Sequence, residues 1–178
     1  MTVRIVLLRA VNVGGGAKLP MADLRAIAED LGAADPRTYI ASGNLVADVP
    51  GDGDAFDRAL ERAVENRFGF FREVISRTPE QVRTALDAHP FEVLEPKYSY
   101  VTFLLTAPTQ AAIEKARTFE THDDRWQVVG AELHLRYANG AGRPQMKTEA
   151  IGRALGTPGT ARNLNTVRKL IELSSGAD

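Results

Sequence analysis

The chain has 178 residues, 44% of them hydrophobic and 25% charged, and its formal net charge is -1 at pH 7. This length and composition predict one globular domain or two small ones, and they argue against a disordered chain. Because there is no cysteine, disulfides, thiolate catalysis and cysteine-ligated zinc are excluded. No apolar run approaches the roughly 18 residues of a membrane span, so we expect a cytoplasmic protein without a membrane partner.

The first half of the chain alternates strand and helix patterns. Apolar residues at 3–8 predict a buried strand, and Pro20 opens a predicted helix that ends at Gly32. Short strands are expected at residues 38–40 and 45–49, around a Ser42-Gly43-Asn44 turn. A helix at about residues 54–68 and a strand at 70–76 follow. This order, β-α-β-β-α-β, is that of a ferredoxin-like fold, in which both helices cover one face of an antiparallel sheet.

The second half resembles the first. Thr78-Pro79-Glu80-Gln81 predicts the start of a linking helix, with threonine as N-cap and glutamine three residues later. A strand at 98–105, a helix opened by Pro108 and a hairpin of strands at 126–129 and 133–137 come next. Helices at about 147–155 and 162–173 complete the chain, the last one in place of a fourth strand.

These patterns predict an α+β fold of two ferredoxin-like halves, the second imperfect, with C-terminal helices. The expected boundaries are residues 1–77 for the first half, 78–97 for a linking helix and loop, and 98–178 for the second half.

Three polar segments are candidates for a binding site. Asn12, Gly14, Gly15 and Lys18 lie in a glycine-rich loop between a strand and a helix start, where backbone N–H groups favour an anion. The loop lacks the Gly-Lys-Ser/Thr of a nucleotide-binding P-loop, and a simple chain reversal is the alternative interpretation. The other two segments carry Ser42 and Asn44, and Arg162, Asn163 and Thr166. Together with Arg9, these residues are hypothesised to border one polar cleft, although turn formation and helix capping could equally explain the asparagines.

Charge is unevenly distributed near the C-terminus. Residues 133–171 contain seven basic side chains and a single acid, Glu149, which indicates an anion-facing surface or merely solvated helices. His89, His122 and His134 are scattered, so no metal site and no cofactor are predicted. The segment His122-Asp123-Asp124 is interpreted as a solvated acidic loop.

The segments LRAVNVGGGAKLPMADLR, RTYIASGN and TARNLNTVRKL resemble the bacterial domain-of-unknown-function family 1697 (DUF1697). By this resemblance the family's motif positions are Arg9, Asn12, Gly14, Gly15, Met21, Leu24, Tyr39, Ser42, Gly43, Asn44, Thr160, Arg162, Asn163, Thr166 and Leu170. Two departures stand out. Leu164 replaces a common tryptophan, and the Gly142-Arg143-Pro144-Gln145 region lacks a frequent Ser-Lys pair. The resemblance implies ferredoxin-like halves and no particular activity.

Three functions therefore stay open. The first is binding of a phosphate-bearing ligand, either a nucleotide or a nucleic acid, without chemistry. The second is an enzyme acting on a small phosphorylated or carboxylated metabolite, although no general base is evident within the motifs. The third is a protein-interaction module, in which the motif residues serve only the architecture.

Overall fold

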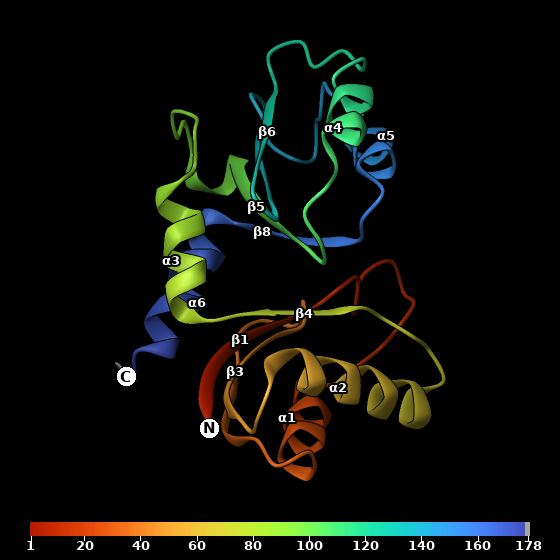
Figure 1. Ribbon diagram of the computed structural model, residues 1–178, viewed down its shortest axis with the longest axis vertical. Helices are drawn as coiled ribbons and strands as arrows, with labels where there is room; N and C mark the ends of the chain where they lie inside the picture. The colour runs from red at the N-terminus through yellow and green to blue at the C-terminus, as the bar shows by residue number, and fades with distance from the viewer. Residues whose placement is uncertain (177–178) are drawn as a thin grey trace. The chain divides into compact units, whose positions relative to one another are not determined.

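The fold consists of two compact units, shown in Figure 1 in a computed structural model that describes residues 1–176. The first unit contains residues 1–84 and the chain from Arg168 onward, and the second contains residues 85–167. Each has a four-stranded antiparallel sheet, ordered β2-β3-β1-β4 in one and β6-β7-β5-β8 in the other. The two orders correspond strand for strand. The predicted α+β fold with ferredoxin-like halves is therefore confirmed.

The first unit has its two helices on one face of the sheet (Figure 1). Its central strand β1 pairs with β3 on one side and β4 on the other. Val6 and Leu8 of β1 belong to a buried cluster with Leu24 of α1 and Leu60 of α2, as the period-2 pattern of a strand requires. The elements are β1 (Thr2–Leu8), α1 (Met21–Asp30), β2 (Ala34–Thr38), β3 (Asn44–Val49), α2 (Gly53–Phe68) and β4 (Val74–Arg77).

The second unit repeats this arrangement around β5. Leu104 of β5, Leu133 of β7 and Ile151 of α5 belong to its buried cluster, and Trp126 packs against that cluster. Two helices, α3 (Pro79–Asp87) and α6 (Leu164–Ser174), each run across the division between the units. The other elements are the 3₁₀ helix η1 (Pro96–Tyr98), β5 (Ser99–Leu104), α4 (Gln110–Ala116), β6 (Arg125–Val129), β7 (Glu132–Arg136), α5 (Thr148–Leu155) and β8 (Gly159–Asn163).

Strand β8 corrects the sequence analysis, which expected a helix from about residue 162 and no fourth strand. The structure forms β8 at Gly159–Asn163 and begins α6 at Leu164. Arg162 lies opposite Val101 of β5 in the antiparallel register. The segment lacks the alternating apolar pattern of a strand, and pairing with β5 decides its conformation. The second unit is thus a complete β-α-β-β-α-β fold, not an imperfect one.

Two other strands are displaced from their expected positions. Strand β2 occupies Ala34–Thr38 instead of residues 38–40, and β4 occupies Val74–Arg77 instead of residues 70–76. Both are terminal strands of their sheet. Because a terminal strand is bounded by the neighbour it pairs with, its limits depend on tertiary contacts more than on its own sequence.

The predicted start of α3 is confirmed in detail. The Thr78 N–H donates to Gln81 Oε1 at 2.8 Å, and the Gln81 N–H donates to Thr78 Oγ1 at 3.1 Å. This reciprocal pair is a capping box, which satisfies two N–H groups that the helix itself cannot.

Side chains of α2 protect the terminal strand β4. Asp57 Oδ2 accepts from the Ser76 N–H and Glu61 Oε1 accepts from the Val74 N–H, both at 2.9 Å, while Arg58 Nη2 donates to the Val74 carbonyl at 2.6 Å. These bonds occupy backbone groups that could otherwise pair with another chain. Burial raises the pKa of Asp57 to about 6, against the opposing effects of the Ser76 hydrogen bonds and the arginine charges.

A histidine pair lies in the second unit. His134 of β7 is fully buried, and its Nδ1 lies 3.2 Å from Nδ1 of His89. Burial, assisted by the neighbouring His89, lowers the pKa of His134 to about 4, and burial also lowers the pKa of His89. Both rings therefore favour the neutral form in the folded protein.

This pair predicts a pH-dependent stability. The unfolded chain binds a proton at His134 near pH 6.5 and the folded chain only near pH 4, so the stability contributed by the neutral ring is lost as the pH falls through that window. The wild-type protein should lose unfolding free energy as the pH falls from 7 to 4. We expect this loss to be smaller in His134→Leu, by on the order of 2 kcal/mol. Urea denaturation at each pH measures it. The matched control His122→Asn, at an exposed histidine, should keep the wild-type slope, and an unchanged slope in His134→Leu would contradict the prediction.

Candidate functional site

In the first unit, Asn12 joins the glycine loop to the turn that carries Ser42. Its Nδ2 donates to the carbonyls of Leu19 at 2.8 Å and Ala41 at 2.7 Å, and its Oδ1 accepts from the Leu19 N–H at 2.8 Å. The Asn12 N–H also donates to the Ala17 carbonyl at 3.1 Å. Asn12 therefore organises the loop, because both amide hydrogens and the amide oxygen are already used within the chain.

The backbone around this loop is held in an unusual conformation. Ala10, Asn12, Ala17 and Ile40 adopt left-handed φ values between 47° and 55°, and they are four of the six such non-glycine residues in the described part of the chain. Each such residue is strained, and strain of this kind persists only where surrounding contacts enforce it. The loop is thus fixed in one shape by the Asn12 hydrogen bonds.

Ser42, Gly43 and Asn44 close the turn between β2 and β3. Asn44 is fully buried, and its Nδ2 donates to the Tyr39 carbonyl and to Ser42 Oγ, both at 3.0 Å. Gly43 has φ +83°, and a Cβ at this position would lie 2.6 Å from Val11 Cγ2. The three residues therefore shape the turn, and the buried Asn44 faces the protein rather than solvent.

A cavity of about 420 Å³ opens beside the glycine loop. Lys18 is exposed and is the one charged side chain among the described residues that line it. Arg9 instead pairs with Glu73 at 3.2 Å in a partly exposed ion pair, and Gly14 lies in the exposed loop outside the cavity wall. We call this the glycine-loop cavity; its lining residues are Asn12, Gly15, Gly16, Lys18, Leu19, Pro20, Met21 and Ala41.

The Gly43 contact gives a test of this local architecture. Gly43→Ala should destabilise the protein by about 2–4 kcal/mol, since the added Cβ meets Val11 and the residue keeps a left-handed φ. Thermal and urea denaturation measure the loss. Gly51→Ala, at a left-handed glycine with nothing within 4 Å, separates the two causes, because it carries the backbone strain without the steric contact. Equal losses in both variants would show that the contact with Val11 is unimportant.

The segment with Arg162, Asn163 and Thr166 lies in the second unit. Arg162 is in β8, not at the start of a helix as predicted, because pairing with β5 extends to Asn163. Its guanidinium is buried and Nη1 donates to Thr160 Oγ1 at 2.6 Å and to the Ala161 carbonyl at 2.9 Å. Burial lowers the pKa of Arg162 to about 10, so it stays charged at neutral pH. This arginine is held within its own strand.

Asn163 has two partners. Its Oδ1 accepts from the Thr166 N–H at 2.9 Å, which caps α6 and gives Thr166 its role. Asn163 also hydrogen-bonds to the Tyr100 hydroxyl, and this bond opposes the rise that burial causes in the pKa of Tyr100. The phenol therefore stays protonated at neutral pH and can donate a hydrogen bond.

Asn163 and Tyr100 line a second cavity, of about 550 Å³, in the same unit. Among the described residues that line it, Lys97 and Arg143 are the charged ones, and none is a carboxylate or a histidine. We call it the polar pocket; its lining residues are Lys97, Tyr98, Tyr100, Asn139, Gly140, Ala141, Gly142, Arg143 and Asn163.

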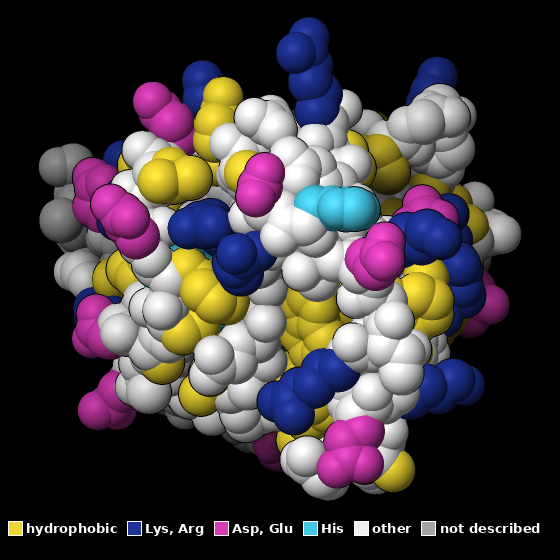
Figure 2. Space-filling model, turned by 90° about the horizontal axis from the view of Figure 1, so that it is seen from above, with side chains coloured by type: hydrophobic (Ala, Val, Ile, Leu, Met, Phe, Trp, Pro, Cys, Tyr) yellow, Lys and Arg dark blue, Asp and Glu magenta, His cyan; other side chains and the backbone are white. Residues whose placement is uncertain are grey.

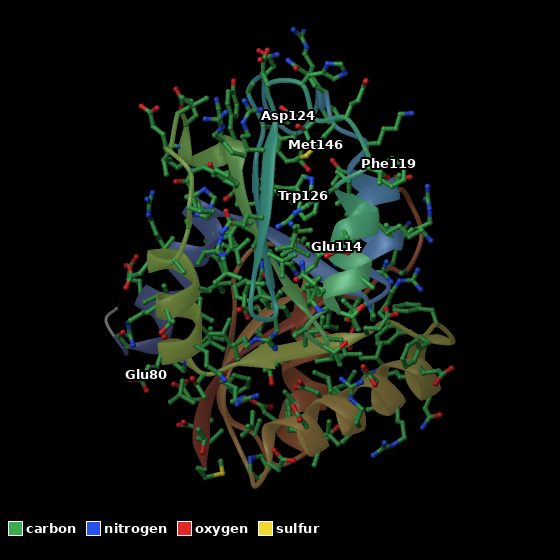
Figure 3. The ribbon with its side chains drawn as sticks, turned by 45° about the horizontal axis from the view of Figure 1, so that its top comes forward. Glu80, Glu114, Phe119, Asp124, Trp126 and Met146 are labelled. Atoms are coloured by element: carbon green, nitrogen blue, oxygen red, sulfur yellow. The ribbon has the colours of Figure 1, made fainter. Side chains whose placement is uncertain are left out.

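The glycine-rich wall of the polar pocket is anchored by Asp124. This buried carboxylate accepts from the N–H groups of Ala138 at 2.8 Å, Gln145 at 2.6 Å and Met146 at 2.9 Å. Figure 3 shows Asp124 beside Met146, close to the start of β6. The interpretation of this segment as a solvated acidic loop was therefore wrong for Asp124. The sequence held no signal for it, because its partners are backbone groups 14 to 22 residues away.

Loss of this anchor should be costly. Asp124→Ala leaves three N–H groups without their acceptor, and we expect a loss of about 3 kcal/mol or more in unfolding free energy. Asp124→Asn keeps an acceptor oxygen and should lose less. Asp123→Ala, next to it and exposed, is the matched control and should leave the midpoint of urea denaturation nearly unchanged. A loss in Asp124→Ala no larger than in the control would contradict the role of Asp124.

The basic residues of positions 133–171 differ in their surroundings. Arg162 is buried, Arg153 lies 3.8 Å from Glu149, and Lys169 pairs with Glu172 at 3.0 Å. Arg136 donates to the Asp123 carbonyl at 3.1 Å, and Arg143 lines the polar pocket.

Among residues 1–176 there is no group of three or more His, Cys, Asp or Glu side chains placed to hold a metal ion. No helix in this part of the chain is long and apolar enough to cross a membrane.

The fold defines an α+β protein built from two ferredoxin-like units, and a glycine-rich loop lines a cavity in each of them. The family model described as "Protein of unknown function (DUF1697)" matches residues 1–134, and the chain belongs to this family. The matched range includes the glycine loop and the Ser42 turn but not the segment with Arg162, Asn163 and Thr166.

One solved structure extends the comparison to nearly the whole chain. It is that of the conserved bacterial protein SP0830 from Streptococcus pneumoniae, with a TM-score of 0.77 and 19% sequence identity. The similarity covers 97% of this chain and 98% of the other. At this identity the similarity establishes the fold. None of the curated proteins compared matches this chain.

Proposed function

We propose that this protein binds a phosphate-bearing small molecule, a nucleotide, in the polar pocket of the second unit, without catalysing a reaction on it. The observation that carries this proposal is the composition of the pocket wall, where Lys97 and Arg143 face no carboxylate. A phosphate group would find two cations there and would not be repelled by an acid.

Neutral hydrogen-bond donors support the same ligand class. Asn139 and Asn163 contribute amides, and Tyr100 contributes a phenol that remains protonated because burial raises its pKa. The Gly140–Gly142 stretch presents backbone with little side chain, as phosphate sites require. Tyr98 adds an aromatic ring, and the Lys97 ammonium lies over it, 5.5 Å from the ring centroid.

A nucleotide fits this surface better than a nucleic acid does. The cavity of about 550 Å³ is within the ordinary size of small-molecule pockets. Figure 2 shows one face of the molecule on which basic and acidic side chains alternate, and the whole chain has a net charge of -1. A long phosphate backbone requires a continuous basic stripe, and the described wall of the polar pocket offers two basic side chains, Lys97 and Arg143.

Binding is favoured over catalysis by the same wall. Among the described residues, no histidine, aspartate or glutamate lines the pocket, and partial burial raises the pKa of the Tyr100 phenol. A general base near neutral pH is therefore missing. Chemistry on a metabolite would need a group from outside this wall.

The test compares AMP with adenosine by isothermal titration calorimetry. We expect wild-type protein to bind AMP at least tenfold more tightly than adenosine, since the phosphate meets Lys97 and Arg143. The double variant Lys97→Gln/Arg143→Gln should lose at least tenfold in affinity for AMP. Its melting temperature without ligand should be nearly unchanged, because both side chains are exposed.

Asn163→Asp tests the charge of the pocket wall while keeping the cap of α6. Aspartate caps a helix as well as asparagine does, so α6 and the melting temperature should be preserved. A negative charge replaces a neutral amide in the pocket wall, so AMP binding should fall at least tenfold. Equal affinity for AMP and adenosine, or AMP binding unaffected by Lys97→Gln/Arg143→Gln, would contradict the proposal. A steep loss of affinity for single-stranded DNA with rising salt would favour nucleic acid instead.

A further inference from the structure

The glycine-loop cavity differs in chemistry from the polar pocket. Most of its wall is apolar, built from Leu19, Pro20, Met21 and Ala41, and Lys18 supplies the one charge. Its volume of about 420 Å³ lies at the lower end of the range for small-molecule sites. An apolar wall with one cation suits a small ligand with an apolar body and one negative charge.

The negative charge of such a ligand would meet no opposing acid in the wall. Asp23, in the first turn of α1, is engaged by Arg67, whose Nη2 lies 2.5 Å from Asp23 Oδ1. The residue at the N-cap of α1 is Pro20, and no side chain caps this helix. The uncapped first turn and Lys18 therefore both favour an anion at the same wall.

Gly16 leaves room for the ligand. A Cβ at Gly16 would meet no atom within 4 Å, and its φ lies outside the left-handed range. Neither packing nor backbone conformation within the chain therefore requires glycine here. Because Gly16 lines the cavity, the missing side chain keeps the cavity open at this position.

The loop is also prepared for binding before any ligand arrives. The three side-chain hydrogen bonds of Asn12 hold the loop to Leu19 and Ala41. A wall fixed in this way pays little conformational entropy when a ligand binds.

From these observations we propose that the glycine-loop cavity is a second ligand site, specific for a small molecule with an apolar body and one carboxylate. Lys18 pairs with the carboxylate, and Pro20, Met21 and Ala41 contact the body. A carboxylate is favoured over a phosphate because the wall holds one flexible lysine and no arginine, and a monoanion needs no second cation. This site is independent of the nucleotide proposed for the second unit.

The experiment titrates ¹⁵N-labelled full-length protein with phenylacetate and, in parallel, with phenylacetamide, its neutral counterpart. We expect saturable shifts of the amide signals of Gly15, Gly16 and Lys18 with phenylacetate, and at least fivefold weaker binding of phenylacetamide. Lys18→Gln should remove this preference for the acid. Gly16→Val should abolish binding of both probes, since its side chain fills the cavity without backbone strain.

Gly142→Val is the matched control. Gly142 lines the polar pocket, has a φ outside the left-handed range, and has nothing within 4 Å of a Cβ. Gly142→Val should leave phenylacetate binding unchanged and weaken AMP binding. Gly16→Val should abolish phenylacetate binding and leave AMP binding unchanged. Failure of AMP to bind would therefore refute the nucleotide proposal alone. Phenylacetate shifts that do not saturate, that lie away from Gly15–Lys18, or that persist in Gly16→Val would overturn the second site.

Discussion

Both cavities depend on one constraint: the backbone groups of a loop need hydrogen-bond partners when secondary structure cannot supply them. One polar side chain meets this need in each unit. Asn12 binds both backbone groups of Leu19 and the carbonyl of Ala41, and Asp124 accepts three N–H groups at the two ends of residues 138–146. The glycine-rich walls keep a defined shape because these two side chains are fully engaged.

Side chains that accept hydrogen bonds from backbone N–H groups also protect the sheet of the first unit. Strand β4 would present free N–H groups at the sheet edge, and Asp57 and Glu61 of α2 accept two of them. Burying Asp57 has a cost, visible in its pKa of about 6, which is tolerated because an unpaired edge invites association with other chains. Asp57, Glu61 and Asp124 thus all serve backbone groups.

This use of polar residues bears on how the family motifs are interpreted. Asn12, Ser42, Asn44 and Arg162 occupy motif positions, and the structure engages each of them with its own chain. The charged residues that line the two cavities, Lys18 beside the glycine loop and Lys97 and Arg143 in the polar pocket, are not among these motif positions. Asn12, Ser42, Asn44 and Arg162 thus maintain the local structure around the cavities.

The sequence by itself determined the helices, the alternation of strands, the capping box at Thr78 and Gln81, and hence the ferredoxin-like class, because these depend on contacts between near neighbours. Tertiary structure alone decided β8, where pairing with β5 outweighed local helix signals, and the limits of the terminal strands β2 and β4. It also decided the sites. Asn12 meets Ala41 across 29 residues and Asp124 meets Met146 across 22, and such contacts follow from sheet order rather than from any local pattern.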